Sequence, residues 1–409
     1  MSSKVQTALK FAAAVSRERT SRTAGSAVAH AVRRELAGRP ADLACLFFSS
    51  QYAESADELA EAVRKELAPR LLIGCSGEGV IGGGEEIESV PAVTLWAASL
   101  PAVALTPFRL SADRDDYGIS LTGWRGDLDA PAAPLSFLLL ADPFSTPMDD
   151  VLSLIADRCP GSPAIGGLAG GGRDQGDNRM VLEERVYDDG LVGVALTGPL
   201  AIRTVISQGC RPIGERYMVT RAKHNVIHEL SGAPALERLK ALFGSLGEEE
   251  QRLAQRALHI GVVMDEQRNR FERGDFLVRN LIGADQRSGS VAIGDVVREG
   301  QTVQFHLRDA RSATEDLHLM LAAERARHPQ PPLGALVFSC CGRGEGLFGR
   351  PHHDISVLKE RIGDVPTAGF FAQGEIGPVG SSNFLHGYTA SVALFSEPDV
   401  EPAHATLSR

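Results

Sequence analysis

The sequence has no CxxC pair and none of the cysteine spacings of small secreted domains. Its six cysteines are scattered over 409 residues, and three of them stand beside predicted strands, where a reduced cysteine packs as a small apolar side chain. This pattern indicates a reducing compartment, and we expect a cytoplasmic protein. No standard zinc-ligand spacing is present either, so neither a metal nor a cofactor is predicted.

The sequence also lacks an excess of positive charge and an uninterrupted membrane-spanning run. Its formal net charge of −10 argues against nucleic acid as the main partner. Residues 89–108 carry no charge but contain three prolines, so they are better interpreted as two strands joined by a turn. The apolar run near the N-terminus is interrupted by Lys10 and makes a poor signal peptide. We therefore expect a soluble protein with no membrane partner.

What the sequence does contain is a pattern that recurs three times. Apolar runs at residues 44–50, 137–145 and 335–344 each end in small or polar residues, as expected for strands buried on both faces. Each run is followed by a segment with helical features and then by a second apolar run that ends in glycines: "LLIGCSGEGVIGGG", "PAIGGLAGGG" and "TAGFFAQGEIGPVG". This regularity predicts a strand–helix–strand unit followed by a glycine-rich hairpin, used three times.

Local signals place the ends of some helices. Ser55 and Glu58 have the spacing of a capping box at the start of the first of these helices. Ser231 is predicted to be the N-cap of a helix over residues 231–244, which Gly244 would end. A further helix is predicted over residues 312–328.

The length predicts two domains rather than one hydrophobic core. Strands outnumber helices and often follow one another directly, which favours a mixed α/β (α+β) fold with mixed or antiparallel sheets covered by helices, layered α-β-β-α. We expect the domains to span residues 28–220 and 221–396, with flanking segments at 1–27 and 397–409.

Two charged residues among glycines are the first candidates for a ligand site. Glu375 follows Gly374, and it either binds the positive group of a ligand or accepts backbone N–H groups and holds its own loop. Arg343 follows a predicted buried strand, and it either grips a ligand carboxylate or pairs with Glu345 or Glu375. The mechanistic hypothesis is an Arg343–Glu375 couple that opens to hold both ends of an amino acid.

Four more residues complete the predicted ligand-binding set. Arg279 and Asn280 interrupt an apolar strand and need partners, in a pocket or in an internal ion pair. Cys340 and Asn383 lie near Arg343 and Glu375 in sequence. In the first unit, Glu78 takes the place that Glu375 has in the third, which predicts a second pocket formed by Cys75, Ser76 and Glu78.

Two other function classes stay open. Cys340 or Cys341 beside Arg343 would have a lowered thiol pKa and serve as the nucleophile of a hydrolase or transferase, with a histidine as base: His352, His353 or His386. No known nucleophile signature surrounds these cysteines, so no catalytic residue is assigned. A protein-interaction scaffold is the other class, and an exposed apolar patch would mark it.

The segments "ALVFSCCGRGEGLFG", "TAGFFAQGEIGPVG" and "LHGYTASVALF" resemble the FIST family, and "LLIGCSGEGVIG" is similar to the opening of its N-terminal half. The resemblance divides the chain into an N-terminal FIST-like domain, 28–220, and a C-terminal one, 221–396. It implies a sensory protein of signal transduction that binds a small polar metabolite, such as an amino acid. No kinase, cyclase or chemotaxis segment is visible, so we expect a separate signalling protein to supply the output.

Overall fold

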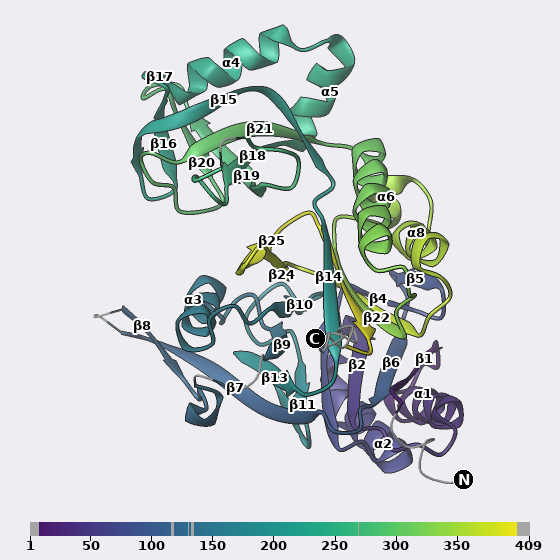
Figure 1. The fold of residues 1–409 in the computed structure, drawn as a ribbon. Coiled ribbons are helices and arrows are strands. Elements are labelled where there is room, and N and C mark those ends of the chain that lie inside the picture. The colour runs from purple at the N-terminus through teal and green to yellow at the C-terminus, as the bar shows by residue number, and fades with distance from the viewer. Residues whose placement is uncertain (1–7, 116–117, 130, 132–134, 269, 399–409) are drawn as a thin grey trace, which may run out of the picture.

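The computed structural model describes residues 8–115, 118–129, 131, 135–268 and 270–398, so the outermost parts of both predicted flanking segments lie outside the described residues. Figure 1 shows two parts: a body built from residues 8–207 and 310–398, and a lobe built from residues 210–308. In the described residues, eight α-helices lie against mixed and antiparallel sheets, which confirms the predicted α+β class.

The body contains the three predicted strand–helix–strand units. In each unit the two strands pair in parallel, because the helix between them carries the chain back to the same end of the sheet. The strand pairs are β2 (Leu43–Ser49) with β3 (Leu71–Gly77), β9 (Ser136–Ala141) with β10 (Ala164–Leu168), and β22 (Gly334–Cys340) with β23 (Thr367–Ala372). The helices are α2 (Ala56–Leu67), α3 (Met148–Arg158) and α8 (His353–Ile362), with 3-10 turns η1 (Ser50–Ser55) and η2 (Gly126–Leu128) and the short α7 (Gly344–Phe348) nearby.

Antiparallel strands extend each sheet beyond the first strand of its unit. They are β6 (Val93–Ser99) and β1 (Lys10–Ser16) in the first sheet, β13 (Leu191–Thr197), β7 (Ala104–Asp115) and β8 (Gly118–Thr122) in the second, and β26 (Ala390–Ser396) and β14 (Ala201–Ser207) in the third. Helix α1 (Ser21–Leu36) connects β1 to β2, and α6 (Ala310–Arg327) precedes β22 in the same way. Strands β6 and β7 confirm that residues 89–108 form two strands.

The three sheets exchange hairpins in a ring. The hairpin that follows each unit leaves its own sheet and pairs with the second strand of another unit. Hairpin β4 (Gly79–Gly82)–β5 (Glu85–Glu88) pairs with β23, β11 (Met180–Leu182)–β12 (Arg185–Tyr187) pairs with β3, and β24 (Glu375–Val379)–β25 (Ser382–His386) pairs with β10. Each unit therefore gives one hairpin and receives one.

The glycine-rich segments lie where the exchanged hairpins cross. The N–H of Gly170 donates to Ser76 O at 3.1 Å. A Cβ on Gly170 would lie 2.9 Å from Phe371 O and 3.0 Å from Glu78 N, so backbone from the other two units occupies the space of a side chain. Close backbone approach is a reason to require glycine, and here it accounts for glycine in the second unit.

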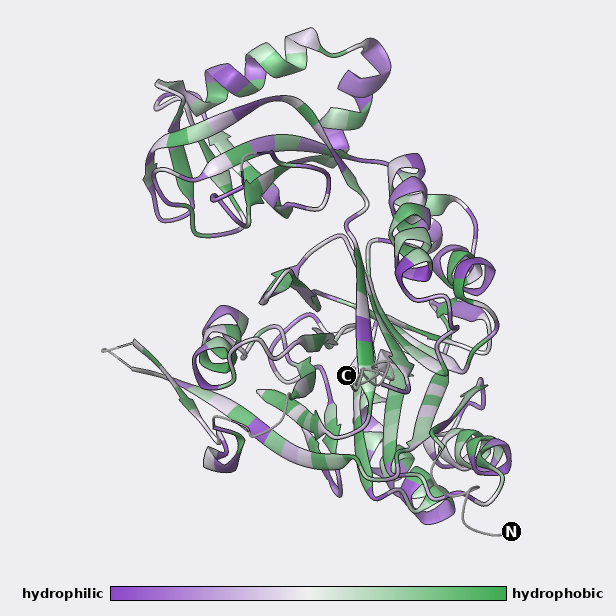
Figure 2. Ribbon diagram, in the orientation of Figure 1, coloured by the Kyte–Doolittle hydropathy of each residue, from purple (hydrophilic) through white to green (hydrophobic). Residues whose placement is uncertain are grey.

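The core of the body lies between its sheets. Rings from different units pack together, with Phe47 5.1 Å from Phe370 and 6.2 Å from Phe338 between centroids. Helices α1 and α2 cover the outer face of the first sheet, and α6 and α8 cover that of the third. In Figure 2 the strands of the body are largely hydrophobic, and the helices that cover them carry hydrophilic residues on their outer sides. None of the described helices has both the length and the apolar character needed to cross a bilayer.

The lobe is a sheet that closes on itself, because β15 pairs with both β21 and β16. Its strands are β15 (Cys210–Lys223), β16 (Val226–Leu230), β17 (Ala233–Pro234), β18 (Leu258–Val263), β19 (Phe276–Asp285), β20 (Ser290–Ile293) and β21 (Thr302–Arg308), and its helices are α4 (Ala235–Ser245) and α5 (Glu248–Ala257). The strands that follow the lobe return to the body, so sheets of the body combine strands from both sides of residue 220.

Two predicted helix starts are wrong in detail. Ser55 does precede α2, but its side chain makes no capping hydrogen bond, and its Oγ lies 2.5 Å from Ser21 Oγ on α1 instead. Helix α4 begins at Ala235 rather than at Ser231, because residues 233–234 pair with β16 first. The helix predicted over residues 312–328 is α6, and the Asp309 side chain caps it by accepting from Ser312 N.

Replacing Gly170 with alanine is expected to destabilise the body by about 1–3 kcal/mol, because the new methyl group would press on two backbone segments. Chemical denaturation measures the effect. Gly126→Ala is the matched control, since nothing lies within 4 Å of a Cβ at that exposed position. Equal denaturation midpoints for the two variants would contradict the crowding of the exchanged hairpins.

Candidate functional site

A cavity of about 450 Å³ lies between the lobe and the body. The lobe contributes strand β19, the turn after β20 and the end of β21 to its wall. The body contributes α3, the end of β22 and the segments on either side of the β24–β25 hairpin. Three of the predicted ligand-binding residues line this cavity: Arg279, Asn280 and Cys340.

Arg308, at the end of β21, is a cation in this wall without a carboxylate partner among the described residues. Its guanidinium carbon lies 4.9 Å from the centroid of the Tyr388 ring. Its Nη1 is 2.9 Å from where a Cβ on Gly342 would be, so the guanidinium packs close against the backbone at this glycine. Its buried Nε and Nη2 have no hydrogen-bond partner in the described part of the chain. Buried donors are nearly always satisfied, which marks Arg308 as a group suited to an anionic ligand.

The same cavity also presents carboxylates. Arg279 donates from Nε to Asp295 Oδ2 at 2.6 Å and from Nη2 to Leu385 O at 3.1 Å, which confirms the predicted internal ion pair. Asp149 on α3 lines the cavity too, and burial, reinforced by the charge of Asp295, raises its pKa. The wall therefore combines an unpaired guanidinium with an acidic group that a ligand cation would stabilise.

Two adjacent thiols lie in this wall, and their environments differ. Cys340 is buried, and its hydrogen bond to Cys341, together with burial, raises its pKa well above the usual value. Cys341 is exposed, and the hydrogen bond with Cys340 lowers its pKa. Partial burial and the charges of Glu375 and Glu78 act in the opposite direction and raise the pKa of Cys341, whereas the charge of Arg308 lowers it. Glu78, from the second predicted pocket, thus lies within electrostatic reach of the first.

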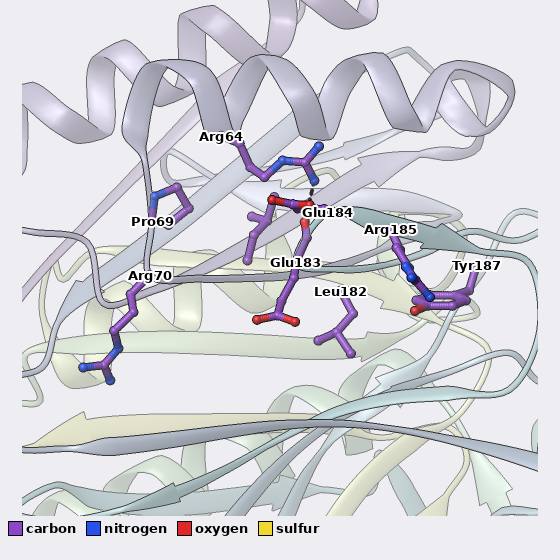
Figure 3. A pocket seen from close by; sticks show the side chains of 9 residues that line it. Arg64, Pro69, Arg70, Leu182, Glu183, Glu184, Arg185 and Tyr187 are labelled. Carbon is purple, nitrogen blue, oxygen red and sulfur yellow. Dashed lines mark hydrogen bonds between the residues drawn. The ribbon is translucent and has the colours of Figure 1, made fainter. Parts of the chain in front are cut away.

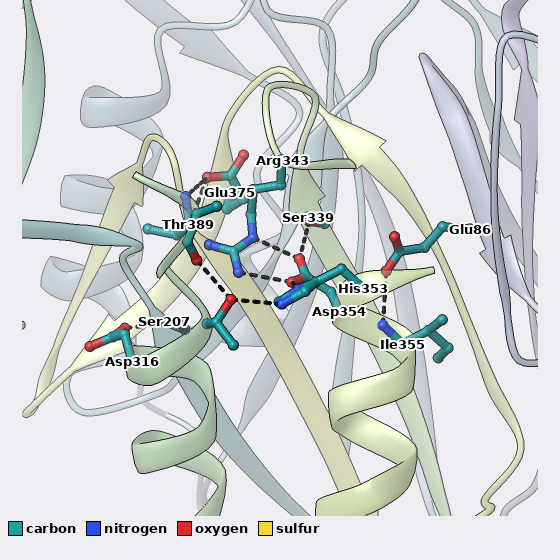
Figure 4. A network of polar contacts seen from close by, with 12 residues as sticks. Glu86, Ser207, Asp316, Ser339, Arg343, His353, Asp354, Ile355, Glu375 and Thr389 are labelled. Carbon is teal, nitrogen blue, oxygen red and sulfur yellow. Dashed lines mark hydrogen bonds and ion pairs between the residues drawn. The ribbon is translucent and has the colours of Figure 1, made fainter. Parts of the chain in front are cut away.

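Arg343 is fully buried and lies at the centre of the polar network of Figure 4. It donates from Nε to Asp354 Oδ2 at 2.6 Å and from Nη2 to Oδ1 at 2.9 Å. Burial alone would raise the pKa of Asp354. The charge and hydrogen bonds of Arg343 outweigh the effect of burial and hold the pKa of this carboxyl well below its usual range. The predicted Arg343–Glu375 couple is therefore wrong in its partner. Sequence reasoning did not identify Asp354 as the partner of Arg343.

Glu375 holds its own segment, as one of the two interpretations expected. Its Oε2 accepts from Thr389 N at 3.0 Å and from Thr389 Oγ1 at 2.6 Å, and the residue is fully buried. Burial raises its pKa well above the usual value. Its Oε1 has no partner among the described residues, so a role toward a ligand stays a prediction.

The remaining predicted residues lie at the crossings of the hairpins. Asn383 donates to Ser162 O at 2.9 Å and accepts from Ala164 N at 2.8 Å, which ties hairpin β24–β25 to the second unit. Cys75 is buried in the core, and Ser76 Oγ accepts from Arg179 N at 3.1 Å. None of Asn383, Cys75 and Ser76 lines the cavity between lobe and body.

A second cavity, of about 510 Å³, lies between the end of α2 and hairpin β11–β12 (Figure 3). Two of its three arginines have protein partners: Arg64 donates to Glu183 O, and Arg70 lies 3.5 Å from Asp42. Glu183 and Glu184 add negative charge beside them. These mixed and mostly exposed charges make this cavity a weaker candidate than the one that contains Arg308.

Glu86 on β5 connects the exchanged hairpin to the buried network. Its Oε1 accepts from Ile355 N at 2.8 Å, at the start of α8 (Figure 4). Burial, reinforced by the charge of Asp354, raises its pKa to about 8. The protonated form of Glu86 is therefore favoured in the folded protein.

The family comparisons confirm the resemblance that the sequence motifs indicated. The FIST N domain matches residues 42–233, and the FIST C domain matches residues 235–378. The chain belongs to the FIST family. FIST domains are associated with sensory functions in signal transduction. The cavity takes Asp149 from the region of the FIST N domain, and Arg308 and Cys341 from that of the FIST C domain.

Two mycobacterial relatives share almost the whole chain. An uncharacterized protein of Mycobacterium tuberculosis strain H37Rv is 45% identical over 374 residues, which cover 91% of this chain and 96% of the relative. An uncharacterized protein of Mycobacterium bovis is 42% identical over 374 residues, covering 91% and 95%.

Glu86→Gln is expected to flatten the pH dependence of stability. Because the pKa of Glu86 is about 8 in the folded protein and about 4.3 in an unfolded chain, its contribution is complete below the unfolded value and is lost as pH rises toward 8. Between pH 5 and 8 the unfolding free energy of the parent should therefore fall more steeply than that of Glu86→Gln. The two slopes should differ by up to about 1.4 kcal/mol per pH unit.

Urea denaturation across this pH range measures the difference between parent and variant. Glu85→Gln is the control, because Glu85 pairs with Arg17 on the surface, and its curve should run parallel to that of the parent. Parallel curves for Glu86→Gln as well would show that the buried carboxyl does not titrate with folding.

Proposed function

We propose that this FIST protein is a cytoplasmic sensor that binds a small metabolite with a carboxylate and an amino group, such as an amino acid, in the cavity between lobe and body. A separate signalling protein would read the bound state. The observation that carries the proposal is the unpaired guanidinium of Arg308, which faces the same cavity as Asp149 and Asp295.

The size and chemistry of the cavity support a ligand of this class. A volume of about 450 Å³ falls within the range of small-molecule sites. A guanidinium without a carboxylate partner among the described residues suits the carboxylate of a ligand. The acidic side chains of the wall would favour an ammonium group at the other end of the ligand. All six cysteines are free, in keeping with a reducing compartment.

The position of the cavity supports a sensory role. The lobe joins the body through the chain between β14 and β15 and through the chain between β21 and α6 (Figure 1). A ligand that contacts both walls would favour one arrangement of lobe and body, and a ligand shifts a conformational equilibrium through such differential contacts. A partner that recognises the favoured arrangement would then detect the ligand.

Thermal unfolding against a panel of amino acids and organic acids tests the proposal. A compound at about 100 times its dissociation constant should stabilise the protein by about 2.7 kcal/mol. The shift should disappear in Arg308→Gln, which removes the charge, and persist in the control Arg185→Gln, which lies at the other cavity. A panel without any stabilising compound, or a shift that Arg308→Gln retains, would count against this site.

A further inference from the structure

Cys341 is the exposed thiol of this protein, and the other five cysteines are buried. It follows the last residue of β22, and its N–H donates to Ala372 O at 2.8 Å, so the backbone at the thiol is fixed by the neighbouring strand. The thiol lies in the wall of the cavity between Cys340 and Gly342. A fixed, accessible thiol inside a cavity differs from a surface cysteine, because the cavity selects what reaches it.

The guanidinium of Arg308 lies beside Gly342, the residue that follows Cys341. A Cβ at position 342 would be 2.9 Å from Arg308 Nη1, so the guanidinium lies close to the backbone beside the thiol. Two further nitrogens of Arg308 are buried without a partner in the described residues. The thiol and an unsatisfied cation therefore share one wall, so a molecule held by its carboxylate at Arg308 would present its adjoining atoms to sulfur.

We propose that Cys341 is a thiol-exchange site for small disulfides that carry a carboxylate, with Arg308 holding the carboxylate. In the step, the thiolate of Cys341 attacks one sulfur of the disulfide, a new sulfur–sulfur bond forms, and the old one breaks. The departing thiolate takes the electron pair, so no further oxidant is needed. Attack by a free thiol on the mixed disulfide reverses the reaction.

The neighbouring groups suit this chemistry. Cys340 is buried and donates a hydrogen bond to the sulfur of Cys341, which favours the thiolate at position 341 and leaves Cys340 protonated. Glu78 acts in the opposite direction, because its negative charge disfavours the thiolate and repels anions. This inference concerns the same cavity as the proposed function, but it rests on the thiol and Arg308 rather than on the metabolite.

The experiment compares two aliphatic disulfides of similar length on the full chain: dithiodipropionate, which has two carboxylates, and cystamine, which has two ammonium groups. Intact-mass spectrometry follows the formation of one adduct per chain, and each rate is divided by the rate of the same reagent with a free thiol. We expect the dicarboxylate to react about tenfold faster than cystamine after this correction. Cys341→Ser should abolish the fast adduct with both reagents.

Two variants separate the role of Arg308 from general reactivity. Arg308→Gln should remove the preference for the dicarboxylate, and Arg308→Lys should retain part of it. Glu78→Gln should speed the reaction with the dicarboxylate, and because Glu78 is exposed the change leaves the packing intact. Glu184→Gln, exposed at the other cavity, is the matched control and should leave the rate unchanged.

The absence of a fast adduct, an adduct at another cysteine, or equal corrected rates for the two reagents would overturn the inference. So would a charge preference that survives in Arg308→Gln. The outcome is separate from that of the metabolite panel: a stabilising metabolite without a Cys341 adduct leaves the proposed function in place, and an adduct without such a metabolite leaves only the thiol-exchange site.

Discussion

The exchange of hairpins between three strand–helix–strand units is the constraint on which the body depends. Strand β3 is completed by β11, β23 by β4, and β10 by β24, so each unit leaves the edge of its own parallel pair open until another unit covers it. An unpaired edge exposes a row of hydrogen-bonding groups. The three units must therefore assemble together, and their chains cross in a region so crowded that Gly170 has no room for a methyl group.

This crossing also forms one side of the candidate site. Gln373 N donates to Leu168 O, and Leu168 N donates to Gly374 O, which fixes the segment that leads from the third unit into the exchanged hairpin. Cys341 is held to the same segment through Ala372 O. The opposite wall, with Arg279 and Arg308, comes from the lobe. A site with one wall in an interlocked body and the other in a part joined by two connections is suited to respond to a ligand by movement of the lobe.

The sequence allowed the units to be predicted but not their exchange. A strand buried on both faces reads as a continuous apolar run, so the repeated runs and helices could be recognised, and the glycines after them indicated turns or close approaches. Which sheet receives a hairpin depends on partners far away in the sequence, about which a local pattern says nothing. The same applies to Ser55, whose hydroxyl contacts Ser21 on another helix rather than its own backbone.

Only part of the candidate site could be predicted from the sequence, and the reason is again that a local pattern does not reveal distant partners. Glycines beside Arg343 and Glu375 suggested an open ligand loop, yet both side chains are buried: Arg343 pairs with Asp354, and Glu375 is tied to Thr389. Burying a charge is costly unless it is paired and hydrogen-bonded, so in this chain the glycine-flanked charges belong to the packing of the units. Arg308 ends an ordinary strand and has no such sequence signal. It bears the cost of burial without a carboxylate partner among the described residues, which is why a ligand anion has more to contribute at Arg308 than at Arg343.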